Sequence, residues 1–500
     1  MHPGAHPRDR AAVVMAGSGA TLGYGDLDDH SIQLARHWHE AGLRSGDHVA
    51  ILLENQPSYF EVVWAALRSG LYYTPVNFHL TPDEVAYVLA DCGARAVVTS
   101  PTQIGKLTSL PDEVDVLIVG DTYEPALARH PAEPLSDQPC GHGMFYSSGT
   151  TGRPKGILFP LPDRQVTDDD PMVISGGPLG LADGCVYLLP APLYHTSPVV
   201  TGALCHRYGG TVVVMERFDA AGCLDAIEHY QVDVAQFVPT MFVRMLKLPE
   251  DERDRYDLSS LRHVSHAAAP CPVDVKRRMI EWWGPIILEF YAGSENVGST
   301  MITSQEWLEH PGSVGLPRFC TTYICDDDFN VLPIGEVGNV WFDTPGASME
   351  YHGDPEKTAE GRSPQGWYTM GDVGRLDDDG YLYLTDRKTF MIISGGVNIY
   401  PQESEDVLLA HPAVLDAAVI GIPNDDLGEE AKAVVQLVDP AAADDELAAE
   451  LLAHCQANLA RYKCPRSVDF VEQLPREDSG KLYKRRLRDE YWGDQESRIV

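Results

Sequence analysis

The sequence lacks several features that define common protein classes. No uninterrupted apolar run reaches the length of a membrane-spanning helix, and no long apolar core follows the basic residues of the N-terminus. We therefore expect a cytoplasmic protein without a membrane span. The 10 cysteines include no CxxC pair, and Cys320 and Cys325 have no nearby histidine pair to complete a zinc site. The cysteines are expected to be reduced thiols.

Basic residues are also scarce. The chain has 38 Lys and Arg residues against 74 Asp and Glu, which gives a formal net charge of -36. Such a surface repels a phosphate backbone, so general nucleic-acid binding and docking on anionic lipid are disfavoured. A polyanionic ligand would need a locally positive or amide-rich pocket. The 500 residues, 44% of them hydrophobic, are typical of a globular protein with two or more domains.

Helix and strand patterns alternate along the first half of the chain. A helix capped by Asp26 is expected to run to Glu40, and a helical stretch that opens at Pro57 lies between apolar strands at 48–53 and 71–77. Further strands at 186–190, 211–214 and 234–238 alternate with helical segments such as 219–230. Alternation of this kind predicts βα crossovers on a largely parallel sheet.

The second half has a different texture. From about Gly335 short strands and turns follow one another, and Asp379-Gly380 is a hairpin signal. After residue 396 the pattern is helix, strand, strand, helix over roughly a hundred residues, the size of a small domain. We therefore predict an α/β protein, with a large N-terminal body of βα units with sheets and a small β-rich subdomain, followed by a small α+β C-terminal domain.

One loop carries the sharpest chemical signal, YSSGTTGRPKG at residues 146–156. Glycines let backbone amides approach an oligophosphate, hydroxyls donate hydrogen bonds, and Lys155 adds a positive charge. The GxxxxGK[ST] order is absent, which disfavours a P-loop NTPase. The candidate phosphate-binding residues are Ser147, Ser148, Gly149, Thr150, Thr151, Gly152 and Lys155.

This loop resembles the phosphate loop of the acyl-CoA synthetase, adenylation-domain and luciferase superfamily, and further matches follow in the expected order. Ala267-Ala268-Ala269-Pro270 and Tyr291-Ala292-Gly293-Ser294-Glu295 resemble its adenine-binding segments, the second ending in the glutamate associated with magnesium. Residues 355–360 and 368–372 resemble the stretch that leads to the ribose-binding aspartate, here Asp372. Together these matches span nearly the whole chain.

The C-terminal part continues the resemblance. Residues 386–388 and 391–400 resemble the hinge region, and the segment at 475–484 contains a catalytic lysine candidate, Lys481. The resemblance implies a mobile C-terminal domain at 387–500, an N-terminal domain at 1–386 that binds ATP and the acyl group, and a hinge near 386–390. It also implies that Lys481 and the Ser394-Gly395-Gly396 loop take turns at the active site, the glycines letting a pantetheine arm pass.

The implied cofactors are ATP, Mg2+ and coenzyme A as co-substrate. The implied catalytic residues are Lys481, Glu295, Lys155 and Thr151, with Glu295 also the Mg2+ ligand. The nucleotide and cofactor site would add Arg387 and the segments named above, and His195 and Ala267 would lie beside the acyl group. These roles are chemically reasonable, because a carboxylate that attacks the α-phosphate must overcome charge repulsion, which cations relieve.

Three positions depart from the superfamily pattern. Thr389 stands where Asp or Lys is usual in the hinge, and Ser294 replaces the commoner Thr before Glu295. After the phosphate loop, the segment at 159–171 is rich in proline and acids, which suggests a loop at the pocket mouth. None of the three removes a charge that the chemistry requires.

The resemblance implies an ATP-dependent acid:CoA ligase that forms an acyl-AMP intermediate and releases pyrophosphate. One alternative is a stand-alone adenylation enzyme that loads a carrier protein in trans, and another is a catalytically silent acyl-adenylate-binding protein. Its partners would be a small carboxylic acid, ATP and CoA, and a homodimer is also open. Local motifs do not identify the acid, which is expected to be a fatty acid or a polycyclic carboxylic acid. The small residues at 267–269 and the loop after Phe159 suit a bulky ring system, such as a steroid-like or terpenoid acid.

Overall fold

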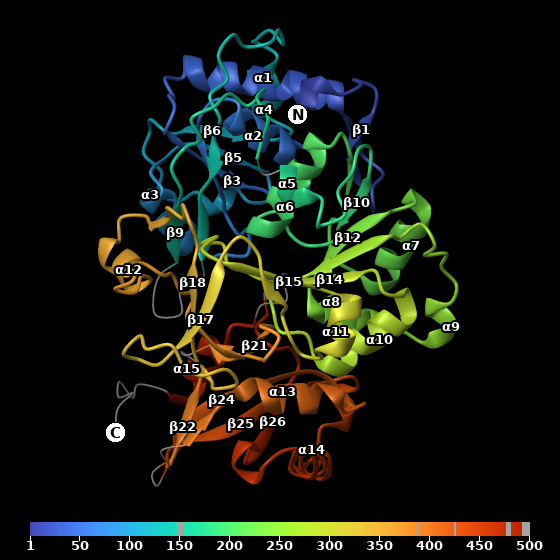
Figure 1. The fold of residues 1–500 in the computed structure, drawn as a ribbon. Coiled ribbons are helices and arrows are strands. Elements are labelled where there is room, and N and C mark those ends of the chain that lie inside the picture. Colours follow the sequence, from blue (N-terminus) through green and yellow to red (C-terminus); the bar gives the residue numbers. More distant parts are fainter. Residues whose placement is uncertain are drawn as a thin grey trace. The chain divides into compact units, whose positions relative to one another are not determined.

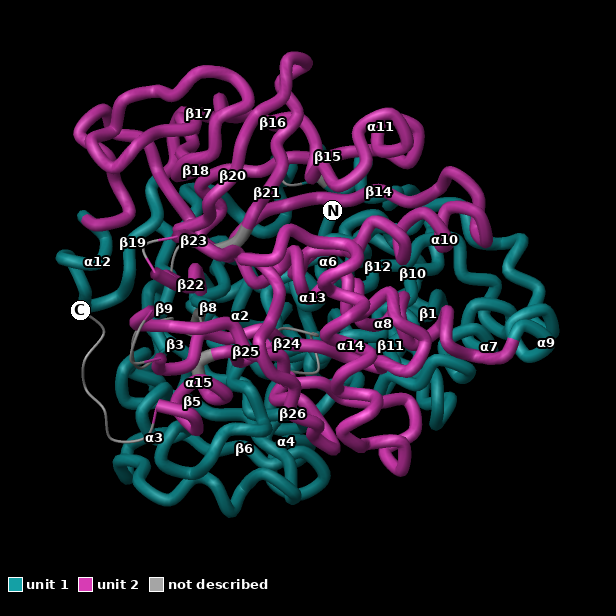
Figure 2. Tube along the Cα trace, turned by 90° about the horizontal axis from the view of Figure 1, so that it is seen from below, with its two compact units in different colours: residues 1–237, 250–265, 348–359 teal, residues 238–249, 266–347, 360–500 magenta. Residues whose placement is uncertain are grey.

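The computed structural model describes residues 1–147, 154–171, 173–387, 390–395, 397–424, 427–476 and 482–492. The chain forms two compact units, neither of which is continuous in sequence (Figures 1 and 2). Unit 1 contains Met1–Phe237, Glu250–Ser265 and Ser348–Ala359, and unit 2 contains Val238–Pro249, His266–Ala347 and Glu360–Val500. A separate boundary near 386–390 stays a prediction.

The first sheet of unit 1 is parallel, with strand order β6-β5-β3-β4-β7. Its strands are β3 (His48–Leu52), β4 (Tyr72–Pro75), β5 (Ala94–Thr99), β6 (Asp115–Ile118) and β7 (His142–Gly143). Val49 to Leu52 of the central strand are fully buried, as expected for a parallel strand covered on both faces.

A second group of strands in unit 1 pairs in the order β12-β10-β11-β1-β2, parallel except for the last pair. A small antiparallel sheet has the order β19-β9-β8. These strands are β1 (Ala11–Met15), β2 (Thr21–Gly23), β8 (Phe145–Ser147), β9 (Lys155–Leu158), β10 (Val186–Leu189), β11 (Thr211–Val214), β12 (Val234–Phe237) and β19 (Glu350–Tyr351), with β13 (His263–His266) ending where unit 2 resumes. The predicted parallel pairing is confirmed.

The helices of unit 1 follow the predicted alternation, with one correction at a start. They are α1 (Tyr24–Glu40), α2 (Ser58–Leu67), α3 (Pro82–Asp91), α4 (Tyr123–Leu127), α5 (Val173–Gly176), α6 (Thr196–Arg207), α7 (Ala220–Tyr230), α9 (Glu250–Arg253) and most of α12 (Pro355–Glu360). Asp26 does not cap α1, because the helix begins after Gly23 and Asp26 lies in its first turn. Asp219 does cap α7, accepting the Gly222 N–H at 2.6 Å.

Unit 2 is built on antiparallel pairings. Strands β14, β15 and β16 pair in sequence, and β17-β18-β20-β21 form a second sheet. The strands are β14 (Ile287–Ala292), β15 (Ser299–Thr303), β16 (Leu316–Pro317), β17 (Thr321–Cys325), β18 (Gly338–Asp343), β20 (Asp372–Leu376) and β21 (Leu382–Arg387), and the helices of this part are α8 (Pro239–Leu246), α10 (Val273–Trp283) and α11 (Ser304–Glu309). The predicted hairpin signal is confirmed, since Gly380 turns β20 into β21 at φ +85°.

The last part of unit 2 has the predicted α+β composition. Its sheet has the order β23-β22-β25-β24, with β26 parallel to β25. The elements are β22 (Ile392–Ser394), β23 (Val397–Ile399), α13 (Pro401–Ala410), β24 (Val414–Asn424), β25 (Gly428–Leu437), α14 (Asp445–Asn458), β26 (Ser467–Val471) and α15 (Lys484–Trp492). Among the described residues, no helix combines the length and apolar character that crossing a bilayer requires.

The unusual segment at 159–171 is firmly fastened to unit 1. Asp170 is buried and accepts bonds from two guanidinium groups, at 2.8 Å from Arg164 Nη2 and 2.9 Å from Arg207 Nε. The Val166 N–H donates to the Gln138 carbonyl at 2.8 Å. This acid-rich segment is therefore an ordered part of the unit, and its expected place at a pocket mouth stays a prediction.

Candidate active site

Two of the predicted nucleotide segments meet inside unit 2. Tyr291 lies near the end of β14, and Asp372 is the first residue of β20. The Tyr291 hydroxyl donates a hydrogen bond to the Asp372 carboxylate at 2.5 Å. Asp372 is 7% exposed, so this bond is made mostly out of water. The contact joins residues far apart in the sequence.

Glu295 reaches the same place through a turn at Gly293. The Asn296 N–H donates to the Gly293 carbonyl at 3.0 Å, which closes the turn after β14. A Cβ added at Gly293 would lie 2.5 Å from both Glu295 Oε2 and Met370 Sδ, so these two side-chain ends pack directly against the glycine. The Glu295 carboxylate therefore lies beside both Gly293 and the segment that leads to Asp372.

The third segment, Ala267 to Pro270, connects β13 to α10. Ala268 is exposed and has φ +75°, a left-handed conformation that costs alanine roughly 1 to 2 kcal/mol. Such strain in a folded chain often marks a functional loop. The base of the loop lies beside β14, because His266 Nε2 is 3.5 Å from Glu289 Oε2.

The chemistry of these groups fits ATP and Mg2+. Carboxylate oxygens are the ligands that Mg2+ prefers, and Glu295 supplies them beside the turn at Gly293. Asp372 is suited to accept hydrogen bonds from ribose hydroxyls. When bound, the metal ion would neutralise charge on the phosphates. The Tyr291–Ser294 segment leads directly to Glu295 and adds no charge.

Lys155 of unit 1 is already paired in this structure. It is the first residue of β9, and its Nζ lies 2.7 Å from Asp354 Oδ2. The hydrogen bond to Asp354 raises the pKa of Lys155, and the same bond lowers the pKa of the Asp354 carboxyl. The sequence did not point to this partner. Lys155 must exchange Asp354 for a phosphate if it is to act as predicted.

His195 is held at the start of α6 by a loop that a buried asparagine fixes. The Asn55 side chain accepts the Leu193 N–H at 2.8 Å and donates to the Ala191 and Met215 carbonyls at 3.2 and 2.8 Å. Sequence reasoning missed Asn55, because a lone asparagine carries no local signal. The loop after β10 thereby presents His195 from a rigid base.

The His195 ring packs against a neighbouring aromatic side chain. The His195 ring lies 4.3 Å from that of Tyr194, which in turn meets the ring of Phe78 edge-on at 5.3 Å. Rings in such arrangements attract one another beyond their buried area. This group is an apolar surface with a polar tip, and the substrate role of His195 stays a prediction.

Some predicted residues lie apart from these groups or outside the described residues. Ser394 and Gly395 are in the β22–β23 turn, where Gly395 has φ +57° and donates its N–H to the Leu427 carbonyl at 2.8 Å. The predicted positions outside the described residues are Ser148, Gly149, Thr150, Thr151, Gly152, Thr389, Gly396 and Lys481, together with the side chains of Ser147 and Arg387. Their roles stay predictions.

A family model described as AMP-binding enzyme matches residues 2–352. The chain belongs to this family. A second model, described as AMP-binding enzyme C-terminal domain, matches residues 403–481. Together the two matches cover the phosphate loop, the segments at 267–270 and 291–295, and Lys481, while Asp372 lies between them.

Relatives of this AMP-binding enzyme are similar over almost their whole length. A feruloyl-CoA synthase of Amycolatopsis sp is 34% identical over 483 residues, which cover 95% of each chain. The fatty acid--[acyl-carrier-protein] ligase ScoC of Streptomyces coeruleorubidus is 31% identical and covers 96% of this chain and 94% of its own. The crystal structure of ATP-bound MatB from Rhodopseudomonas palustris superposes with a TM-score of 0.81 at 26% identity, covering 97% and 96% of the two chains.

The comparisons confirm the resemblance to acyl-CoA synthetases of the adenylate-forming superfamily and the predicted α/β fold. The AMP-binding enzyme is an acid–thiol ligase, and its predicted reaction is confirmed at the level of the family. That reaction is ATP-dependent ligation of a carboxylic acid to CoA through acyl-AMP, with ATP, Mg2+ and CoA taking part.

Proposed function

We propose that this AMP-binding enzyme activates a ring-bearing carboxylic acid on the nucleotide site of unit 2. The observation that carries the proposal is the convergence of the Tyr291–Asp372 hydrogen bond with Glu295 beside Gly293 and Met370. Separate segments supply a metal-binding carboxylate, a sugar-binding carboxylate and an aromatic face. Nucleotide binding needs this set of groups close together.

The residue roles follow from the chemistry of each group. Glu295 holds Mg2+ against the phosphates, and Asp372 accepts hydrogen bonds from the ribose while Tyr291 fixes the orientation of its carboxylate. The Ala267–Pro270 and Tyr291–Ser294 segments flank the adenine. Lys155, the phosphate loop and Lys481 supply the positive charge that lets a carboxylate attack the α-phosphate.

The proposed acid carries a ring. Two observations favour this class over a linear fatty acid: a relative at 34% identity is named for feruloyl-CoA, and the His195 ring packs on Tyr194, whose other neighbour is the Phe78 ring. Aromatic side chains pack well on flat rings. Polycyclic acids belong to the same class and extend it toward larger substrates.

The test is carboxylate-dependent release of pyrophosphate with ATP and Mg2+, across linear, aromatic and polycyclic acids. Aromatic or polycyclic acids should give the highest kcat/KM, and a preference for linear fatty acids would contradict the proposed class. Glu295→Gln should lower pyrophosphate release by about 10²-fold, because the neutral amide is a weaker ligand for Mg2+. Glu309→Gln, on the exposed surface of α11, is the matched control and should leave the rate unchanged.

A carrier protein is the second candidate acceptor, since the relative ScoC is named as a ligase for an acyl-carrier protein. Adding CoA to the adenylation mixture should yield an acyl-CoA mass. Release of pyrophosphate without acyl-CoA, together with acylation of a phosphopantetheinylated carrier protein, would favour the second acceptor. No pyrophosphate with any acid would favour a silent binding protein.

A further inference from the structure

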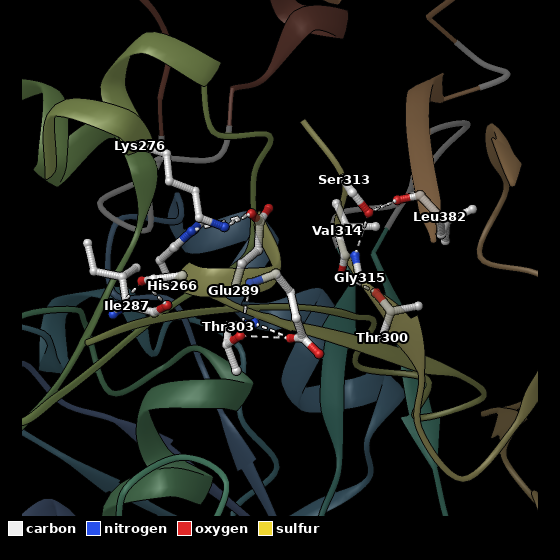
Figure 3. Close-up of polar contacts among 12 residues, drawn as sticks. His266, Lys276, Ile287, Glu289, Thr300, Thr303, Ser313, Val314, Gly315 and Leu382 are labelled. Atoms are coloured by element: carbon white, nitrogen blue, oxygen red, sulfur yellow. Dashed lines mark hydrogen bonds and ion pairs between the residues drawn. The ribbon is translucent and has the colours of Figure 1, made fainter. Parts of the chain in front are cut away.

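A buried ion pair joins α10 to β14 in unit 2 (Figure 3). Lys276 of α10 and Glu289 of β14 are joined by a contact of 2.5 Å between Nζ and Oε2. The Lys276 side chain is 0% exposed and that of Glu289 is 7% exposed. The ammonium also lies 4.9 Å from the centre of the Trp307 ring. Two charges withdrawn from water in this way carry a large desolvation cost.

His266 is the third member of this cluster. It is fully buried, its Nε2 lies 3.5 Å from the same carboxylate oxygen, and its ring packs edge-on against Phe242 at 5.3 Å. Burial, reinforced by the charge of Lys276, lowers the pKa of His266 well below its usual value, so the ring is neutral. Neither ring nitrogen has a hydrogen-bond partner within the described residues.

The residues of the cluster lie on both sides of the first nucleotide segment. His266 immediately precedes the Ala267–Pro270 loop, and Lys276 lies in the helix that follows it. Both side chains converge on Glu289, which is two residues before Tyr291 and therefore on the same face of β14. The Glu289 carboxylate thus ties the helix after the first nucleotide segment to the strand that carries the second, and the neutral His266 ring packs beside the same carboxylate.

A second fastening holds β14 at its beginning. The Ile287 N–H donates to Ser304 Oγ at 3.0 Å, and the Ser304 hydroxyl donates to the Ile287 carbonyl at 2.8 Å (Figure 3). Ser304 holds the start of β14, and the Lys276–Glu289 pair holds the middle of β14 to α10. Together the two contacts fix the position of β14 relative to α10 and to the Ala267–Pro270 loop that precedes α10.

We propose that Lys276 and Glu289 are positioning residues for ATP, which hold the Ala267–Pro270 and Tyr291–Glu295 segments at the spacing that the nucleotide requires. The proposal rests on the proposed function of these segments. Lys276 and Glu289 act through the two segments and do not contact substrate. Misplacement of binding groups by about 1 Å is enough to cost a large factor in rate or affinity.

The experiment compares three variants in the full-length enzyme. Lys276→Met/Glu289→Leu removes both charges and restores apolar packing, so it should fold with a melting temperature near that of the wild type. Its KM for ATP should rise roughly tenfold while its KM for the acid stays unchanged. Glu289→Asp keeps both charges and shortens the side chain by one methylene, and its KM for ATP should rise by a smaller factor.

The matched control is the buried Arg68–Asp28 pair of unit 1, with a contact of 2.6 Å and side chains 1% and 12% exposed. Arg68→Met/Asp28→Leu should leave the KM for ATP unchanged. A wild-type KM for ATP in the folded Lys276→Met/Glu289→Leu protein would overturn the proposal. If that variant does not fold, a wild-type value in Glu289→Asp overturns it equally.

Pyrophosphate release by the wild-type enzyme tests the proposed function separately from the positioning role of Lys276 and Glu289. If the wild type releases no pyrophosphate with any acid, the proposed function fails, and calorimetric titration with ATP alone then measures the variants. A loss of ATP affinity in the variants would support the positioning role even in that case. Equal affinity in wild type and variants would contradict it.

Discussion

Two lysines of this enzyme make ion pairs of similar length in different surroundings. Lys155 of unit 1 meets Asp354 at 2.7 Å with side chains 38% and 24% exposed, whereas Lys276 of unit 2 meets Glu289 at 2.5 Å with side chains 0% and 7% exposed. Water and salt compete with the first pair, so it can exchange its partner. The second pair has no such competitor.

The difference separates a lysine suited to release its partner from one suited to hold it. Lys155 lies in a recognisable motif, and in its proposed role it exchanges Asp354 for a phosphate. Lys276 lies in an ordinary amphipathic helix, and its importance comes from where the chain places it. Motifs therefore identify exchangeable contacts more readily than permanent ones.

The largest expected effect is on the permanent pair. Lys276→Met should lower the free energy of unfolding by about 3 to 5 kcal/mol, because it leaves the Glu289 carboxylate buried without a partner. Urea denaturation followed by intrinsic fluorescence measures the change. A loss of unfolding free energy below about 1 kcal/mol is usual for surface ion pairs. Such a small loss would mean that the Lys276–Glu289 pair stabilises the fold no more than an exposed pair does.

The pH dependence of the same variant sharpens the comparison. Burial raises the pKa of Glu289, and in Lys276→Met the opposing charge of Lys276 is gone, so the pKa rises further. A folded-state pKa above the unfolded one gives stability that is present at low pH and lost as pH rises through the folded pKa. The deficit of Lys276→Met should therefore be smaller near about pH 5.5 than near about pH 8. An equal deficit at both would show that charge is not its cause.

An intermediate effect is expected at the nucleotide site itself. Tyr291→Phe removes the donor to the Asp372 carboxylate but keeps the ring that packs 6.1 Å from Phe342. Loss of a bond to a charged group should cost about 1.5 to 3 kcal/mol of unfolding free energy and raise the KM for ATP. Thermal unfolding and pyrophosphate kinetics measure the two effects. Unchanged ATP kinetics would show that Tyr291 does not orient Asp372 for the ribose.

The smallest effect is expected at the exchangeable pair. Asp354→Asn removes the charge beside Lys155 but keeps a side-chain oxygen. That oxygen can still accept the hydrogen bond from the Lys357 N–H, 2.9 Å long in the wild type, in the first turn of α12. The melting temperature should stay at the wild-type value, and the KM for ATP should fall or stay equal because Lys155 loses a competitor. A marked drop in melting temperature would mean that this pair also holds the fold.

Contiguous patterns made most of the fold predictable. The βα alternation of unit 1 predicted strands β3, β4, β10, β11 and β12 to within a residue or two, and Asp219 marked the start of α7. The prediction that Asp26 caps α1 was wrong, because an acidic residue in the first turn of a helix and one at its N-cap give the same sequence signal. The capping position went to Gly23, where the chain leaves β2.

The candidate site was predictable only where its residues are consecutive. Tyr291 to Glu295 and Asp372 stand in motifs, and the structure brings them together. Asn55, Asp354 and Glu289 carry no local signal, since each acts on a partner that only folding brings near. Burial and hydrogen bonding, which sequence does not display, reveal them.

The fastening of the 159–171 segment bears on how the enzyme survives in a cell. A stretch rich in proline and aspartate reads as exposed linker, the kind of chain that proteases cut. Cleavage needs several residues to unfold into a protease cleft, and here Asp170 would first have to part from both Arg164 and Arg207 in a buried setting. We therefore expect these two guanidinium contacts to slow proteolysis of a segment whose composition is typical of a cleavage site.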